Sequence, residues 1–482
     1  MSSQYDAWSK LLEDSEQDVG WNWSSLWNYM KKAEAFSPPN DQQRAKGADS
    51  IDSYHGFDGP VQVTYPDLMY GGAEQPNFVQ TVQNLIGIEL SPDLNGGNSN
   101  CVSFTPLSIN WHDEDHRSSA ATAYLSPVED QRTNWLTLVN NQVTRILFAD
   151  GSEAPHTATG VEFGTSNGTR YTANARREVI LAAGAIQTPA LLQLSGIGDS
   201  ELLGQLGINT LINLKTVGKN LQEQTMNSLG AHGNGFDKGG SGPSDVIAYP
   251  NLKQVFGSSA DAVAQNLTNA LPGWALSQAS SALSADALEE IYQIQADLII
   301  NQNAPVVELF YDTGYPEYAT SFSPVICGGV LIKAWTSVIW ALICGNYFRL
   351  AEEMSQSRVP WDLDVQIAGA RLSRAILGSS PTSSLSTGET IPGFDTVPST
   401  ASDDQWKTWI LNGFSAVSHP IGTVSMMRRD LGGVVDAHLI VYDTTNVRVV
   451  DASVLPLQVS AHLSSTLYGV AEKAADLIKA AQ

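Results

Sequence analysis

One short stretch constrains the fold more than any other part of this 482-residue chain. Residues 177–185, REVILAAGA, give a short apolar strand that ends in small residues, and IQTPALLQLSG follows at once with helical character. A strand, a small-residue turn and a helix in this order are the layout of a parallel α/β sheet. Near the C-terminus, NVRVVDAS (446–453) predicts a second strand with a turn, and a long amphipathic helix follows from residue 462.

The remaining patterns predict elements of other kinds. Residues 1–36 show apolar residues near helical spacing, and Pro38–Pro39 ends that pattern. The turn in HGFDGPVQVTY (55–65) leads into an alternating strand, residues 135–165 favour strands, and residues 255–305 favour helices. A chain of this length suggests two interleaved domains, and we predict a mixed fold, α/β plus α+β.

The charge of the chain limits its partners. Asp and Glu number 50 against 26 Lys and Arg, which gives a net charge of -24. A surface this acidic repels phosphate backbones and anionic lipid. We therefore expect no nucleic-acid or membrane partner, and a neutral or cationic small molecule as substrate.

The strongly apolar stretch Cys327–Phe348 fits the rest poorly and leaves three interpretations open. It could be a buried segment, a membrane anchor, or a sequence abnormality such as a retained intron. Lys333 interrupts it, and its uninterrupted apolar part is shorter than the ~20 residues that a membrane span needs.

The processing signals disagree with one another. Sequons at Asn22, Asn167 and Asn266 permit glycosylation and hint at secretion, whereas residues 1–20 have neither the basic nor the apolar region of a signal peptide. Three cysteines, Cys101, Cys327 and Cys344, make no disulfide framework. We expect a mature fragment or an incomplete gene model of a secreted protein.

Two histidines near the C-terminus are candidates for chemistry. His419 lies in SHPIGT and His462 in VSAHLSST, at the start of the last helix. The strand between them could return the chain so that both rings meet. Imidazole suits general-base work because its ordinary pKa, ~6.5, lies near working pH. The alternative is that each histidine only caps a turn or a helix.

Several motifs together resemble one family, the glucose–methanol–choline (GMC) flavoprotein oxidoreductases. They run through the chain in family order, and the similarity is closest to fungal glucose oxidase and aryl-alcohol oxidase-like members. The motifs are GWNWSSLWNYMKKAE (20–34), HGFDGPVQV (55–63), RSSAATAYLSP (117–127), GAIQTPALLQLSGIG (184–198), VGKNLQEQT (217–225), HPIGTVSMM (419–427) and GGVVDAHLIVYDTTNVRVVDASVLP (432–456).

The resemblance implies a fold and an activity. It implies a Rossmann-like FAD/NAD(P)-binding domain, formed by residues 1–60, 128–245 and 425–482. A substrate domain, with an antiparallel sheet packed by helices, would take residues 61–127 and 246–424. The implied activity is the FAD-dependent oxidation of a CH–OH group of an alcohol or sugar, with O₂ or another electron acceptor. By resemblance the location is extracellular.

The resemblance also implies roles for residues of this chain. His419 would be the base that takes the hydroxyl proton while hydride passes to flavin N5. His462 would hydrogen-bond the substrate oxygen, and Glu308 would orient His462. The expected FAD contacts are Val143 at the adenine, Ala183 and Gly184 at the small-residue turn, and Asp451 and Ala452 beside the ribityl chain. No metal is expected.

The sequence departs from the family pattern in three places, of which the stretch Cys327–Phe348 is one. The chain contains no Gly-x-Gly-x-x-Gly, the loop that holds a dinucleotide pyrophosphate, so an N-terminal ADP-binding βαβ unit is expected to be missing. We therefore expect weak FAD binding or none, and the alternative is a truncated, flavin-free and non-catalytic relative. Ser415, Ala416, Val417 and Ser418 stand where glucose oxidases place an Arg and an Asn, so glucose is not the expected substrate.

One further motif imitates a metal site. WHDEDH (111–116) spaces His112 and His116 by four residues, but Asp113 replaces the Glu that a zinc peptidase helix needs, and a solvated acidic turn is the preferred interpretation.

Overall fold

The computed structural model describes residues 1–151, 153–234, 245–312, 326–334 and 360–481. Its largest sheet has seven antiparallel strands in the order β16-β12-β15-β14-β13-β3, with β17 paired to β12. This confirms the expected antiparallel sheet. The strands are β3 (Val102–Phe104), β12 (Thr225–Gly233), β13 (Val246–Ala248), β14 (Val307–Asp312), β15 (Ile326–Ala334), β16 (Ser386–Ile391) and β17 (Ser415–Ala416).

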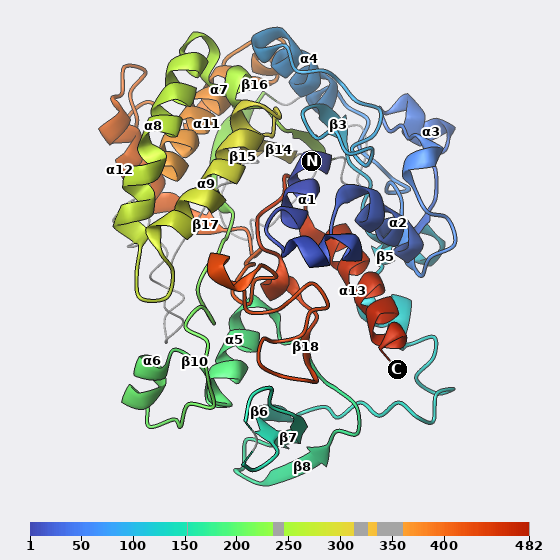
Figure 1. The fold of residues 1–482 in the computed structure, drawn as a ribbon. Helices are drawn as coiled ribbons and strands as arrows, with labels where there is room; N and C mark the ends of the chain where they lie inside the picture. The colour runs from blue at the N-terminus through green and yellow to red at the C-terminus, as the bar shows by residue number, and fades with distance from the viewer. Residues whose placement is uncertain (152, 235–244, 313–325, 335–359, 482) are drawn as a thin grey trace.

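Helices cover this sheet, as Figure 1 shows in its upper half. The long helix α11 packs against β12, β14 and β15, and it contacts α4, α7 and α12. The helices of this layer are α4 (Glu74–Ile86), α7 (Leu252–Phe256), α8 (Ala260–Gln278), α9 (Ala285–Ile300), α11 (Trp361–Leu377) and α12 (Asp403–Gly413). The helical prediction for residues 255–305 is confirmed. β12 belongs to this sheet, although it falls in residues 128–245, which were expected in the other domain.

The second half of the molecule is built on parallel strand pairs and a small antiparallel sheet. β9 (Val179–Leu181) pairs in parallel with β18 (Val447–Val449), and the helix α5 (Gly184–Leu194) follows β9 as the sequence predicts. β1 (Glu34–Phe36) with β2 (Val61–Val63), and β10 (Ile197–Gly198) with β11 (Ile212–Asn213), form further parallel pairs. The small sheet contains β6 (Gln142–Phe148), β7 (Ala158–Gly164) and β8 (Arg170–Asn174).

The strand prediction for residues 135–148 is wrong in its first half. β6 begins only at Gln142, and the apolar side chains of Trp135, Leu136, Leu138 and Val139 are exposed. An apolar run forms a strand only where a neighbour accepts its backbone hydrogen bonds, and residues 135–139 pair with no strand among the described residues.

The two ends of the described chain pack together (Figure 1). Helix α2 (Trp23–Ala33) lies along α13 (Leu463–Ala480), and α1 (Ser2–Ser9) packs on α2. Trp8 and Trp21 are fully buried, and their indole N–H groups donate to the backbone oxygens of Leu457 and Ala437. Burying two Trp side chains with both polar atoms paired fixes this N-terminal segment firmly.

The remaining elements are short: α3 (Asp41–Ala45), α6 (Ser200–Gln205), β4 (Ile109–Asn110), β5 (His116–Arg117), the π-helical turn Ala121–Leu125, and 3₁₀ turns at Asp14–Val19, Asp52–Tyr54, Trp111–Asp113, Gly257–Ser259, Thr382–Leu385, Arg429–Leu431 and Ala452–Val454.

The apolar stretch Cys327–Phe348 is described only over its first part. Residues 327–334 belong to β15, between β12 and β14, so this part is a strand of the antiparallel sheet. The rest of the stretch lies outside the described residues. Within the described parts of the chain, no helix combines the length and the apolar character needed to cross a membrane.

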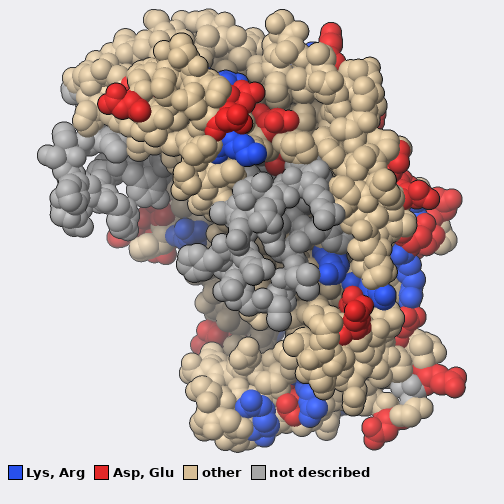
Figure 2. All heavy atoms as spheres, turned by 90° about the vertical axis from the view of Figure 1, so that its left-hand side faces the viewer, with Lys and Arg blue, Asp and Glu red and all other residues tan. Residues whose placement is uncertain are grey.

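Charged side chains are interspersed on the face drawn in Figure 2, where Lys and Arg lie in small groups beside Asp and Glu. Several acidic and basic side chains form pairs at 2.6–2.8 Å, such as Arg374 with Glu389 and Arg448 with Glu178. The excess of acid therefore coexists with ion pairs at the surface and in partly buried positions.

A buried histidine connects β1 with the segment between α4 and β3. The His55 ring stacks on Phe36 and contacts the carboxylates of Asp93 at 2.8 Å and Glu34 at 3.1 Å. Burial lowers the pKa of His55, but the hydrogen bonds that the ring donates to these two carboxylates, together with their negative charges, outweigh it and raise the pKa to about 9. His55 is therefore a buried cation with two anionic partners, which joins segments distant in sequence.

We predict that His55 makes stability depend on pH in the alkaline range. Its folded-state pKa of about 9 exceeds its ordinary value of 6.5, so its contribution is complete below pH ~6.5 and is lost as pH rises through about 9. Urea unfolding of wild type and His55→Gln at several pH values measures this. The difference in free energy of unfolding should shrink from pH 6.5 to 9. The control His116→Gln removes an exposed imidazole and should give a constant difference. A pH-independent gap for His55→Gln would contradict the prediction.

Candidate active site

The structure brings the two C-terminal histidines together. The rings of His419 and His462 have centroids 5.6 Å apart and meet edge to face at 70°. The predicted convergence of the two imidazoles is therefore confirmed. It arises because the segment after His419 runs beside residues 452–454, where Gly422 N–H bonds Ala452 O and Val424 N–H bonds Ser453 O. The chain then continues from this turn to His462.

The backbone around His419 adopts special conformations that aim the ring. Ser418 has a left-handed φ of +67°, which is uncommon for a residue with a side chain, and Gly422 has φ of +86°. A Cβ at Gly422 would lie 2.3 Å from the carbonyl oxygen of Asn220, so only glycine fits. The HPIG turn is therefore packed against residue 220 with no room for adjustment.

Hydrogen bonds fix which nitrogen of His419 carries the proton. Nδ1 lies 2.8 Å from Oε1 of Gln224, and an amide oxygen can only accept, so Nδ1–H is the donor. The Gln224 amide is oriented in turn by its Nε2, which donates to Gln458 at 3.3 Å. The neutral imidazole therefore has its basic lone pair on Nε2. The backbone is held as well, since His419 N–H donates to Glu223 and Gln458 donates to His419 O.

Glu308 holds the second histidine. It lies on β14 and is 0% exposed, and its Oε1 is 3.1 Å from Nε2 of His462, whose side chain is 43% exposed. His462 occupies the N-cap position of α13 but makes no capping hydrogen bond with its side chain, which argues against a purely capping role. A carboxylate acceptor fixes Nε2–H, so Nδ1 is the atom of His462 that can face a ligand.

The sequence analysis missed the residues that orient His419. Gln224, Glu223 and their neighbours form the polar run QEQT (222–225), which leads into β12 at Thr225, and all four side chains are buried. Four consecutive polar residues next to a strand were a signal of a buried polar network, although the burial itself cannot be read from the sequence.

The expected cofactor residues lie in two connected places. Val143 and Ala183 line one cavity of about 670 Å³, together with strand β9 and the exposed side of α5. Gly184 N–H and Thr188 donate to Oδ2 of Asp451 at 2.9 and 2.6 Å, and Ser453 donates to Oδ1. The Asp451 carboxylate thus joins the Ala183–Gly184 turn to the turn at Ala452. Its side chain is engaged by the protein, so only its backbone remains for a ligand.

These features fit part of FAD. The cavity is large enough for an adenosine group, and the small-residue turn opens the N-terminus of α5, where a Cβ added at Gly184 would meet nothing within 4 Å. The paired imidazoles provide a proton acceptor and a hydrogen-bond donor. The segment that follows His419 runs beside the second of these two turns, the turn at Ala452. A glycine-rich pyrophosphate loop is not part of the sequence.

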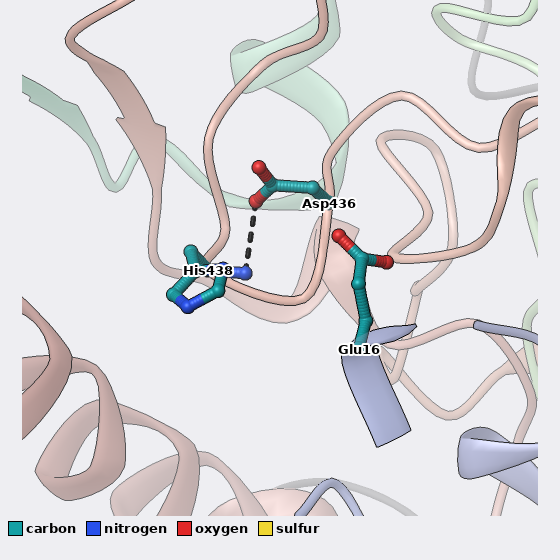
Figure 3. A group of neighbouring side chains, drawn as sticks. All are labelled: Glu16, Asp436 and His438. Carbon is teal, nitrogen blue, oxygen red and sulfur yellow. Dashed lines mark hydrogen bonds between the residues drawn. The ribbon is translucent and has the colours of Figure 1, made fainter. Parts of the chain in front are cut away.

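One group of side chains could hold a metal by distance alone. Among the described residues, Glu16, Asp436 and His438 have ligand atoms within 4.8 Å of one another (Figure 3). Asp436 accepts from the backbone N–H of His438 and Ile440, and Glu16 accepts from Ala437 N–H. The acids therefore stabilise the turn at 436–440, and burial raises the pKa of both carboxyls. The WHDEDH tract is exposed, with His116 beside Asp113, as expected for a solvated turn.

An antiparallel sheet under helices, a parallel pair with a small-residue turn, and two facing imidazoles backed by a buried carboxylate are compatible with an oxidoreductase that acts on CH–OH donors. Comparison with known proteins agrees. Residues 1–226 and 350–471 match the two family models described as GMC oxidoreductase. The chain belongs to the GMC oxidoreductase family.

Individual relatives support this assignment. The glucose oxidase-like protein fsoC of Humicola fuscoatra is 37% identical over 488 residues, which cover 99% of this chain and 79% of the relative. Glucose oxidase of Penicillium chrysogenum is 31% identical, with 98% and 76% covered. An FAD-dependent oxidoreductase from Chaetomium thermophilum superposes with a TM-score of 0.82 at 25% identity, covering 100% of this chain and 83% of that one. A fungal aryl-alcohol oxidase gives the same TM-score at 24% identity, which shows the fold.

We predict that Asp451→Asn destabilises the protein by about 2–3 kcal/mol. The amide keeps one acceptor oxygen but turns an NH₂ group toward donors that now lack a partner. Urea unfolding measures the change. The matched control is Asp199→Asn, since Asp199 caps α6 through a single bond to Glu201 N–H and Asn caps equally well. A loss for Asp451→Asn no larger than the control's would contradict the bridging role.

Proposed function

We propose that this protein oxidises the CH–OH group of a neutral alcohol, with His419 as the base. The supporting observation is the edge-to-face pair of imidazoles, in which Gln224 commits Nδ1 of His419 to donation and leaves the lone pair on Nε2. Nε2 of His419 takes the hydroxyl proton. Nδ1 of His462, when protonated, donates to the same substrate oxygen and stabilises the developing alkoxide. Bound FAD supplies the acceptor for the hydride.

Glu308 acts through His462. Its buried carboxylate fixes the ring orientation through Nε2, so one imidazole accepts a proton while the other is held to donate a hydrogen bond. Division of labour between two neighbouring rings requires that their surroundings differ. An amide backs His419 and an anion backs His462, which supplies that difference.

The substrate we propose is less polar than glucose. Residues 415–418 carry only small side chains and one Val, and Ser415 and Ala416 are used as a strand that pairs with β12. A site without long donors here cannot hold several sugar hydroxyls. O₂ or another acceptor would complete the cycle. An extracellular location agrees with sequons at Asn167 and Asn266, both of which are exposed.

For the cofactor, we propose that Val143 and Ala183 contact the adenine end of FAD, and that the backbone of Gly184, Asp451 and Ala452 contacts the ribityl and phosphate part. Residues 1–482 contain no glycine-rich pyrophosphate loop, so these residues alone should bind FAD weakly. Ile180, in the middle of the parallel strand β9, is 46% exposed, whereas parallel strands normally bury both faces. This observation favours the second candidate, a flavin-free relative without catalysis.

One experiment separates the two candidates. The purified 482-residue protein is mixed with excess FAD, and its visible spectrum and FAD affinity are recorded. It is then mixed anaerobically with benzyl alcohol, a short aliphatic alcohol or glucose. Bleaching of the flavin by an alcohol, and less by glucose, supports the enzyme. Bound FAD that no alcohol reduces would contradict the proposed function, and absence of FAD binding would favour the flavin-free relative.

We predict that His419→Gln slows flavin reduction by the alcohol by about 10²–10⁴-fold while the affinity for FAD changes little. The loss follows from removing the proton acceptor, and stopped-flow absorbance measures it. The control His112→Gln removes an exposed histidine of the WHDEDH turn and should leave the rate unchanged. If His419→Gln reduced flavin at the wild-type rate, His419 could not be the base.

A further inference from the structure

A buried tyrosine, Tyr249, follows β13 at the end of the sheet where Glu308 lies on β14. In the antiparallel pair of β13 and β14, Val246 faces Tyr311, Ile247 faces Phe310 and Ala248 faces Leu309. Tyr249 lies two residues after Ile247 and Glu308 two residues before Phe310, so both are expected on the face that the Ile247–Phe310 pair occupies. Side chains directly opposite in antiparallel strands point to the same face, with Cβ atoms about 4.5–5.5 Å apart.

Other contacts confirm that this face leads to His462. Tyr249 packs with Ile247 in a small buried cluster that includes Phe310, and the ring of Phe310 lies 6.0 Å from that of His462. Tyr249 is 3% exposed and Glu308 is 0% exposed. Phenol, carboxylate and imidazole therefore follow one another from the core to the open end of the site.

The carboxylate and the phenol are coupled. Burial raises the pKa of Tyr249 well above its ordinary value, and the charge of Glu308 and a side-chain hydrogen bond to it raise the pKa further. The phenol therefore stays protonated at any working pH and acts only as a donor toward the carboxylate.

We infer that Tyr249 is a positioning residue that shares the Glu308 carboxylate with His462 and so sets how strongly that carboxylate holds the ring proton. The inference rests on the proposed role of His462 for its importance in catalysis. A carboxylate that accepts from a second donor is a weaker base toward the first, because its negative charge is already partly satisfied. The phenol thus keeps His462 from binding its proton too tightly to respond to a substrate oxygen.

The other ionisable groups around this relay are few among the described residues. His419 and, behind it, Glu223 face the open side of His462. Cys101 faces Tyr249, and burial raises the pKa of its thiol to about 11, so it is neutral. On β15, Lys333 stands opposite Glu308 in the register. These groups are unchanged when Tyr249 alone is altered.

The test follows the ring of His462 itself. Histidines are labelled with ¹³C, the His462 signal is assigned by its loss in His462→Gln, and the midpoint of its pH titration is compared between wild type and Tyr249→Phe. Without the phenol O–H, the Glu308 carboxylate has one hydrogen-bond donor fewer, so its negative charge stabilises the protonated form of His462 more strongly. We expect the midpoint to rise by about 0.5–1 pH unit. An unchanged or lowered midpoint would overturn the inference.

Two further variants make the result decisive. Tyr65→Phe removes another buried phenol, whose hydroxyl donates to the backbone oxygen of Asp49, and should leave the His462 midpoint unchanged. If Tyr249→Phe folds poorly, 3-fluorotyrosine placed at position 249 keeps the side-chain volume and makes the phenol a stronger donor. The midpoint should then fall. A purely packing role would change stability in Tyr249→Phe without moving any midpoint.

The titration is independent of the proposed function. If the midpoint rises in Tyr249→Phe but no alcohol reduces bound flavin in wild type, the proposed oxidation fails and the coupling stands. If wild type oxidises alcohols but the midpoint does not move, the oxidation stands and the role of Tyr249 is wrong. Where both hold, flavin reduction by Tyr249→Phe should show the same upward shift in its pH profile, with a smaller loss of rate than His419→Gln.

Discussion

The hydrogen bond between Glu308 and His462 is the contact on which the site depends. It joins a strand of the antiparallel sheet to the N-cap residue of the last helix at a distance of 3.1 Å, and so helps to connect the two halves of the molecule at the candidate active site. A carboxylate with no exposure needs partners, because an unpaired buried charge is far costlier than an unpaired neutral group. The free-energy cost of leaving this carboxylate unpaired therefore favours a fixed arrangement of α13 and β14, and the same cost keeps the imidazole in place.

The sequence was informative about elements with strong local patterns. The strand and small-residue turn at Val179–Gly184, the amphipathic helix α13 and the helices of residues 260–300 form where their patterns predict them. His419, His462 and Glu308 come together as the family resemblance implies. These features could be predicted because each depends on residues close in sequence or on a motif, and both can be recognised in a single sequence.

The missed features depend on contacts between distant segments. Gln224 orients His419, which is 195 residues away in the sequence, and nothing near Gln224 in the sequence indicates which residue it contacts. Residues 135–139 have strand character, but among the described residues no strand lies beside them. Their backbone hydrogen bonds therefore cannot form a sheet, and the local propensity does not decide the structure. The carboxylate of Asp451 accepts four protein hydrogen bonds and joins two turns, and nothing near Asp451 in the sequence indicates these bonds. A sequence shows that a carboxylate is present, and only the packing shows which donors it serves.

The surroundings of the two histidines and the expected cofactor cavity differ in how completely protein groups cover and bond their side chains. Around His419 the polar groups are buried and mutually bonded, through Gln224, Gln458 and Glu223, so the ring geometry is set without any ligand. Around β9 the opposite holds, because the apolar side chains of Val143, Ile180 and Leu194 line one open cavity and remain substantially exposed. Apolar surface of this kind gains free energy when another group covers it, whether a cofactor ring or protein. Proton transfer and cofactor affinity are therefore governed by separate sets of residues, and a weakness in FAD binding would say nothing against the competence of the two histidines.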